Sequence, residues 1–244
     1  MIFCFFTAEE DAELLQASVE QLRRVMPGAR VVVAVDRSAA RMRVPDGCGV
    51  ACVQLSRLEN KSGPALAFDL DSMAQMLQVM EGAMVRYNAS YCVKLDADMW
   101  VRDLGPLLRG GMVAPGMPEP DFVAPEGWRP MVPGPGAFRI SLWGVRHCLR
   151  QVMEGARAGR WLRGMGYAEN VFFYHLLGCS RMPVELVPFS SGYLAGYAQN
   201  AGGVPEAVLQ AGLVHCGEPH RDGSRAGREE VYTRMMLLKA YERA

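Results

Sequence analysis

"YCVKLDADMWVRD" (Tyr91–Asp103) places two carboxylates, Asp96 and Asp98, directly after an apolar run that ends at Leu95. A short, continuous apolar run is typical of a strand that is buried on both faces of a sheet. Residues two apart in an extended chain point the same way, so both carboxylates can reach a single cation. The alternative is an acidic loop after a strand, or an N-cap for the following turn, because D-x-D is common by chance.

A second D-x-D, Asp69 and Asp71, serves as an internal comparison. It lies where apolar residues recur at steps of three and four between Leu66 and Tyr87, a spacing that predicts a helix. Each helical residue turns by about 100°, so these two side chains diverge. Only the pair at the end of the strand is therefore expected to converge on a metal ion.

Four short apolar runs predict buried strands: 1–6, 30–36, 49–55 and 90–96. A helix is predicted after the first strand, opened by the capping-box spacing of Thr7 and Glu10, and another before the fourth. This order predicts an α/β fold with a mostly parallel central sheet covered by helices. Ligands bind at the carboxyl ends of strands in such sheets, where Thr7, Asp36 and the aspartate pair all lie.

The second half of the chain begins with a change of composition. The segment 109–136 holds seven of the 15 prolines and six glycines, which predicts a functional loop around one short strand at 121–125. The elements predicted after it are a strand at 137–143, a helix to about 154, a short helix at 168–178, a loop at 213–227 and an amphipathic C-terminal helix. We expect one domain over 1–244, with a nucleotide-binding half at 1–108 and a smaller acceptor-side half at 109–244.

Composition excludes several classes of protein. Lys plus Arg equals Asp plus Glu at 26 each, so no overall field favours nucleic acid as a partner. Seven cysteines without C-x-x-C spacing argue against a disulfide framework and a structural zinc site. The opening "MIFCFFTAEE" is too short for a signal peptide and turns acidic at once, and no apolar run has the length of a membrane span, so we expect neither. We expect a cytoplasmic protein, with a peripheral position at the inner membrane face as an alternative.

The predicted β-α-β plan, the strand-end Asp36 and "VKLDADMWV" (Val93–Val101) resemble the nucleotide-sugar-dependent glycosyltransferases of the GT-A fold. The resemblance covers most of the chain in plan and rests on short motifs. It implies that Asp96 and Asp98 bind Mn²⁺ or Mg²⁺ together with the diphosphate of a sugar-nucleotide donor, with a UDP-sugar favoured. Such a metal acts as a Lewis acid on the departing diphosphate.

The resemblance also implies contacts with the nucleoside. Thr7 and Asp36 match the segments that line the nucleoside pocket, and Asn60 and Lys61 lie in the polar break that often contacts the nucleotide. Each has an ordinary alternative. Thr7 has the spacing of a helix cap, Asp36 can start a turn, and Lys61 can be a solvated loop lysine.

Two looser matches concern the acceptor side. Many members of the family carry an acidic pair, E-D or D-D, at the start of a helix beyond the acceptor strand. The corresponding segment here is "AENVFF" (Ala168–Phe173), in which Glu169 matches the first acid and Asn170 replaces the second. A late histidine completes the metal site in several members. His215 in "LVHCGEPHRDGSR" corresponds to it, although the glycine that follows, Gly217, comes one place early. An acid in the first turn of a helix and a half-buried histidine are the structural alternatives.

The function predicted is metal-dependent transfer of a sugar from a nucleoside-diphosphate sugar to a glycan, lipid-linked or protein acceptor. Asp98 binds the metal with Asp96 and His215. Glu169 acts as a general base if the reaction inverts, or positions the sugar if it retains configuration. The alternatives are a non-catalytic nucleotide-binding or assembly module of the same fold, or a sugar nucleotidyltransferase. The latter is disfavoured because "FFTAEEDAE" (Phe5–Glu13) is acidic and lacks glycine.

Overall fold

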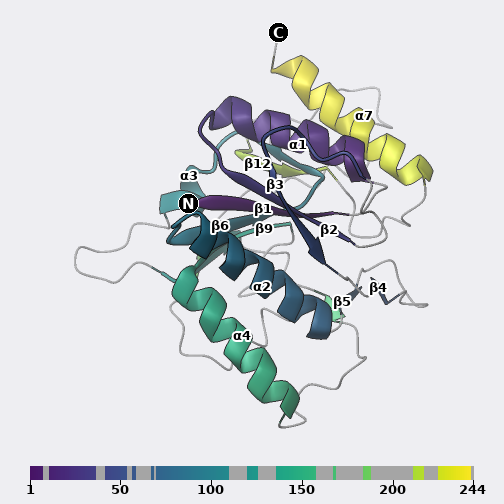
Figure 1. The fold of residues 1–244 in the computed structure, drawn as a ribbon. Coiled ribbons are helices and arrows are strands. Elements are labelled where there is room, and N and C mark those ends of the chain that lie inside the picture. Colours follow the sequence, from purple (N-terminus) through teal and green to yellow (C-terminus); the bar gives the residue numbers. More distant parts are fainter. Residues whose placement is uncertain are drawn as a thin grey trace.

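The computed structural model describes residues 1–7, 11–36, 42–53, 57–58, 67–68, 70–109, 120–125, 136–157, 167–168, 184–187, 211–216 and 225–242. Within this part of the chain, a seven-stranded sheet lies between helices that cover both of its faces (Figure 1).

The strands of this sheet, from one edge to the other, are β11 (Val184–Val187), β8 (Phe122–Pro125), β9 (Ala137–Ser141), β6 (Tyr91–Leu95), β1 (Ile2–Thr7), β2 (Val31–Asp36) and β3 (Gly49–Val53). β9 pairs antiparallel with both β6 and β8, and every other pair in this sheet is parallel. The prediction of a mostly parallel sheet is confirmed, as are strands near 1–6, 30–36, 49–55 and 90–96. The strand at 49–55 is not buried as predicted: β3 lies at an edge of the sheet, and Val50 is exposed.

Helices cover the two faces in pairs. α1 (Ala12–Val25) and α7 (Arg225–Tyr241) lie on one face, whereas α2 (Leu70–Arg86) and α4 (Leu142–Arg157) lie on the other (Figure 1). Side chains alternate along β1, so that Phe3 and Phe5 join the core under α1 and α7, while Ile2 and Cys4 join the core under α2 and α4. This two-sided burial explains why the sequence of β1 is apolar from Ile2 to Phe6.

Two smaller sheets and a short helix complete the described elements. β12 (Leu213–His215) pairs antiparallel with β7 (Met99–Val101). A three-stranded sheet has the order β10 (Tyr167–Ala168), β5 (Ala67–Phe68), β4 (Arg57–Leu58). The short helix is α3 (Gly105–Arg109).

The predicted capping box of the first helix is wrong. Thr7 is the last residue of β1, and α1 begins at Ala12 after the N-cap Asp11. The strand predicted at 137–143 ends at Ser141, because the Ser141 hydroxyl accepts a hydrogen bond from the Gly144 N–H (2.8 Å). That bond satisfies an orphan donor of the first turn of α4, which therefore starts at Leu142.

Two predictions in the second half are also corrected. The segment 213–227 was predicted as a loop, but it begins with β12 and ends inside α7. Ala168, the first residue of the helix predicted at 168–178, belongs to β10. The rest of that predicted helix lies outside the described residues.

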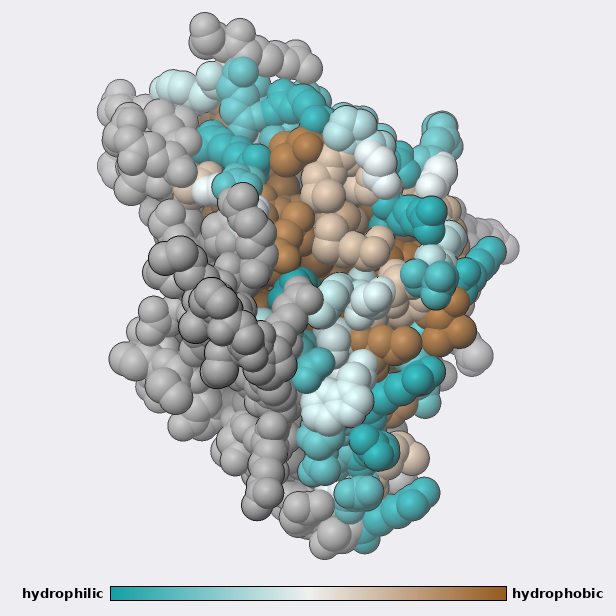
Figure 2. Space-filling model, turned by 90° about the vertical axis from the view of Figure 1, so that its left-hand side faces the viewer, coloured by the Kyte–Doolittle hydropathy of each residue, from teal (hydrophilic) through white to brown (hydrophobic). Residues whose placement is uncertain are grey.

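The surface mixes apolar and hydrophilic side chains. On the side drawn in Figure 2, apolar surface lies near the centre, with hydrophilic side chains above and below it. Exposed large apolar residues are spread over several elements, among them Val50 of β3, Trp143 of α4 and Tyr241 of α7. No helix within the described ranges combines the length and the apolar character needed to span a membrane.

Candidate metal centre

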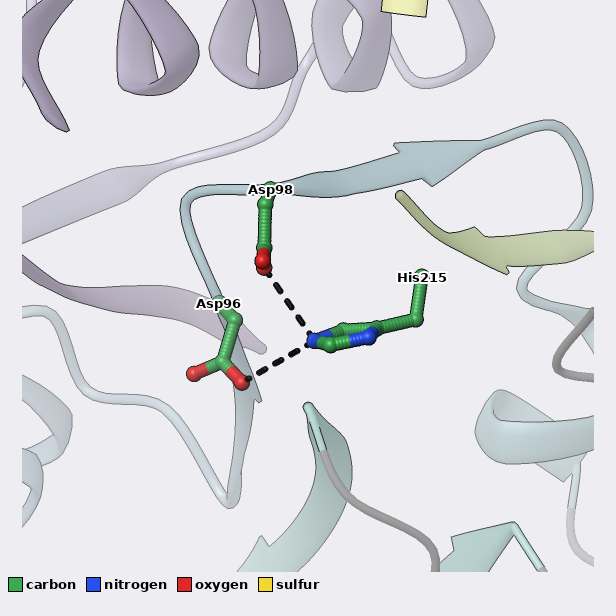
Figure 3. Close-up of side chains that lie close together, drawn as sticks. All are labelled: Asp96, Asp98 and His215. Carbon is green, nitrogen blue, oxygen red and sulfur yellow. Dashed lines mark ion pairs between the residues drawn. The ribbon is translucent and has the colours of Figure 1, made fainter. Parts of the chain in front are cut away.

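Asp96, Asp98 and His215 meet just beyond the carboxyl end of β6 (Figure 3). One ligand atom from each of them lies within 4.8 Å of the others. His215 Nε2 is 3.3 Å from Asp98 Oδ1 and 3.9 Å from Asp96 Oδ2. Two carboxylates and an imidazole that face a common point can hold a divalent ion such as Mn²⁺.

The two aspartates lie in a tight turn between β6 and β7. The Asp96 N–H donates a hydrogen bond to the Gly136 carbonyl (2.8 Å), and the Met99 N–H donates to the Asp96 carbonyl (3.2 Å). Asp98 is the last residue before β7, and its carbonyl accepts a hydrogen bond from the Cys216 N–H (2.9 Å). The backbone of the turn is therefore tied to segments far away in sequence.

A buried serine of α1 holds the turn from a second direction. The Ser18 hydroxyl lies 2.6 Å from the Ala97 carbonyl and 2.7 Å from the Met99 carbonyl, where one hydroxyl proton can serve either acceptor. Ser18 is fully buried. Because its partners are backbone atoms, this contact leaves the aspartate side chains available to a ligand.

His215 reaches the site through strand pairing. It is the last residue of β12, and its register partner on β7 is Met99, which directly follows Asp98. The loop predicted at this position is thus a strand, and the antiparallel ladder is what places the imidazole beside the carboxylates.

Lys94 belongs to the site and was not predicted. It lies two residues before Asp96 on β6, its side chain is 2% exposed, and its Nζ is 2.5 Å from Asp96 Oδ1. The sequence does contain a signal for it. A lysine inside an apolar strand is unusual, and the period of two puts it on the same side as Asp96.

Gly136 forms a wall of the site and was also missed. Its φ is +90°, a conformation that favours glycine. A Cβ at this position would lie 2.8 Å from Met99 Sδ, 2.9 Å from His215 Cδ2 and 3.3 Å from Asp96 Oδ2. The sequence shows only the last glycine of a Pro/Gly-rich segment, so this close approach needed the structure.

The two carboxylates favour a positive charge at the centre. Burial acts to lower the pKa of His215, but the charge of Asp98, its hydrogen bond with the imidazole and the charge of Asp96 outweigh burial and raise that pKa, with Lys94 acting against them. Burial and the charge of Asp98 raise the pKa of the neighbouring Cys216 well above its usual range, so Cys216 remains a thiol. A metal must displace the imidazole proton before His215 can bind it.

The other predicted site residues are placed as follows. Thr7 is buried at the end of β1 and Asp36 is partly exposed at the end of β2. Because β6, β1 and β2 are adjacent and parallel, Thr7 and Asp36 lie with Asp96 at the carboxyl ends of these strands. Asn60, Lys61 and Glu169 lie outside the described residues.

Comparison with known proteins supports the fold. No protein-family model and no curated protein matches this sequence. Among solved structures, the galactosyltransferase LgtC in complex with donor and acceptor sugar analogues is similar, with a TM-score of 0.51, 15% sequence identity and coverage of 96% of each chain. The chain therefore has an α/β fold of the GT-A glycosyltransferase type.

Proposed function

We propose that this protein is a metal-dependent glycosyltransferase, which moves a sugar from a nucleoside-diphosphate sugar to a glycan, lipid-linked or protein acceptor. The observation that carries this proposal is the convergence of Asp96, Asp98 and His215 at the carboxyl edge of a GT-A-like sheet. Ligands of open parallel sheets bind at that edge.

Asp98 and His215 are assigned to hold the metal, Mn²⁺ or Mg²⁺, together with Asp96. The side chain of Asp98 is 15% exposed and that of Asp96 is 33% exposed. Asp96 is therefore the carboxylate nearer to solvent, and we assign it a further contact with the donor ribose or a metal-bound water. The metal supplies Lewis-acid stabilisation of the departing diphosphate.

The remaining roles follow from position at the sheet edge and from the resemblance. Thr7 and Asp36, at the ends of β1 and β2, are assigned to the nucleoside, with Asn60 and Lys61 beside it and UDP as the favoured carrier. Glu169 is assigned to the anomeric carbon on the acceptor side. Residues 1–108 would form the donor half and 109–244 the acceptor half of one domain.

A thermal-shift screen tests the proposal. Wild type is heated with UDP, GDP, CDP or ADP, each with and without Mn²⁺, beside Asp98→Asn and the control Asp46→Asn. Asp46 is an exposed carboxylate that precedes β3, at the amino ends of the parallel strands and thus on the side of the sheet opposite to Asp98. A ligand at 100 times its Kd adds about 2.7 kcal/mol to the folded state. In a chain of this size we expect the unfolding midpoint to rise by about 5–10 °C.

Stabilisation by one nucleotide that requires Mn²⁺, persists in Asp46→Asn and is lost in Asp98→Asn would support the proposal and name the base. No shift with any pair, in a folded wild type, would refute the metal–diphosphate role of the aspartates. Mn²⁺-dependent hydrolysis of the matching sugar nucleotide separates an enzyme from a binding module.

A further inference from the structure

A buried cation shares one of the carboxylates of the candidate metal centre. Lys94 Nζ is 2.5 Å from Asp96 Oδ1, while the other oxygen, Asp96 Oδ2, is 3.9 Å from His215 Nε2. Asp96 thus divides its two oxygens between a fixed ammonium group and the centre. Any metal held by Oδ2 competes with Lys94 for the negative charge of one carboxylate.

The lysine is held in place by its surroundings. On β6 it lies between Cys4 of β1 and Phe138 of β9 in the strand register, and both of these neighbours belong to the core under α2 and α4. A lysine side chain that is 2% exposed cannot swing into solvent as surface lysines do. Its Nζ therefore stays beside Asp96 whether or not a ligand is bound.

The formal charges of Asp96, Asp98 and Lys94 determine which ligands the centre attracts. Two aspartates and one lysine leave the centre at −1, with His215 neutral when it binds a metal. A divalent ion brings it to +1. Without Lys94, the same centre with its metal would be neutral. With Lys94, the metal-loaded centre is positive and attracts a diphosphate better than the neutral centre that would form without Lys94. Before the metal binds, the charge of Lys94 makes the centre less negative and therefore less attractive to a divalent ion.

We propose that Lys94 sets the charge of the metal centre, weakening its affinity for the bare cation and strengthening its affinity for the nucleoside diphosphate. This inference rests on the proposed function, and it makes Lys94 a positioning and charge-setting residue. The two effects have opposite signs, which a purely structural role of Lys94 would not produce.

The experiment uses Lys94→Met, which removes the charge with similar volume, and Lys94→Gln, which removes the charge but keeps a hydrogen-bond donor. Affinity for Mn²⁺ alone is measured by electron paramagnetic resonance. Affinity for the nucleoside diphosphate selected by the screen is measured calorimetrically at saturating Mn²⁺. We expect both variants to bind Mn²⁺ about tenfold more tightly and the diphosphate about tenfold more weakly, as a difference of about 1.4 kcal/mol implies.

The control variant is Lys239→Met, which makes the same change of net charge on α7, where Lys239 pairs with Glu20 of α1 at 3.6 Å. It should change neither affinity. Weakening of both affinities in the Lys94 variants would show a structural role and overturn the inference, as would no change in either. A wild type that binds neither Mn²⁺ nor a diphosphate would instead overturn the proposed function, and this inference with it.

Discussion

Replacing Gly136 by alanine tests how tightly the candidate metal centre is built. Gly136 has φ +90°, and its carbonyl accepts the N–H of Asp96 at 2.8 Å. The added methyl carbon would lie 2.9 Å from His215 Cδ2 and 2.8 Å from Met99 Sδ. The thioether of Met99 can bend away, but the imidazole is a rigid ring at the end of β12 and must move as a unit.

The size of the effect follows from these contacts. Carbon atoms pack at about 3.5 Å or more, so the ring must withdraw by about 0.6 Å from its 2.9 Å position. Positive φ adds about 1–2 kcal/mol for a residue with a Cβ, and overpacking adds about 1–3 kcal/mol. We expect a loss of about 3 kcal/mol, which lowers the unfolding midpoint by about 6–12 °C.

The assay combines thermal unfolding, followed by tryptophan fluorescence, with calorimetric titration of Mn²⁺. Mn²⁺ affinity should fall by about tenfold or more in Gly136→Ala, because metal ligands tolerate only about 0.5 Å of displacement. The matched control is Gly82→Ala, near the C-terminal end of α2, where a Cβ meets no described atom within 4 Å apart from the backbone of the helix itself. It should stabilise the protein by about 0.5–1 kcal/mol and leave Mn²⁺ binding unchanged. If Gly136→Ala unfolds at the wild-type temperature and binds Mn²⁺ with wild-type affinity, the packing around Gly136 does not constrain the metal centre.

Two further predictions concern the scaffold. Glu242→Ala should lower the free energy of unfolding, measured with urea, by about 2–3 kcal/mol, because the carboxylate accepts the buried Trp100 Nε1–H at 2.7 Å and that donor is left unpaired. Glu20→Gln loses the partly exposed ion pair with Lys239 but can still accept the hydrogen bond from Gln16, so it should change this free energy by less than about 0.5 kcal/mol. Equal losses in the two variants would contradict this. Burial raises the pKa of the Cys148 thiol to about 12, so iodoacetamide at pH 8 should alkylate the exposed Cys52 long before Cys148, as peptide mass spectrometry can show. Equal rates in the folded protein would refute that.

The parts of the fold that were predictable are those whose signal is local. β1 and β2 are apolar runs because helices cover both faces of the sheet, β6 is apolar except for Lys94, and α2 carries apolar residues at every third or fourth position. Asp96 and Asp98 follow a strand, whereas Asp71 lies in a helix, so only the first D-x-D pair was expected to direct both carboxylates at one metal ion. These features depend on the period of the side chains, which a sequence displays directly.

The parts that were not predictable depend on pairing between distant segments. β7 and β12 have three residues each, too few for a period, and their pairing is what carries His215 to Asp98. The role of Gly136 depends on how close another strand approaches, which its neighbours in sequence do not encode. Lys94 lies between these cases: the period of two placed its side chain on the same side as Asp96, but the sequence did not show that its Nζ is buried beside that carboxylate.

The structure bears on the bland alternative for the aspartate pair, in which the carboxylates only end a strand or cap a helix. No helix starts in the turn, because the element that follows Asp98 is the strand β7. The short helix α3 begins at Gly105, whose N–H donates to Asp103 Oδ1 at 2.7 Å, so Asp103 performs the local capping. The backbone of the turn is held by Gly136, Cys216 and Ser18 instead. Two partly exposed carboxylates that face an imidazole, in a turn whose backbone is secured by other segments, favour a ligand role over a structural one.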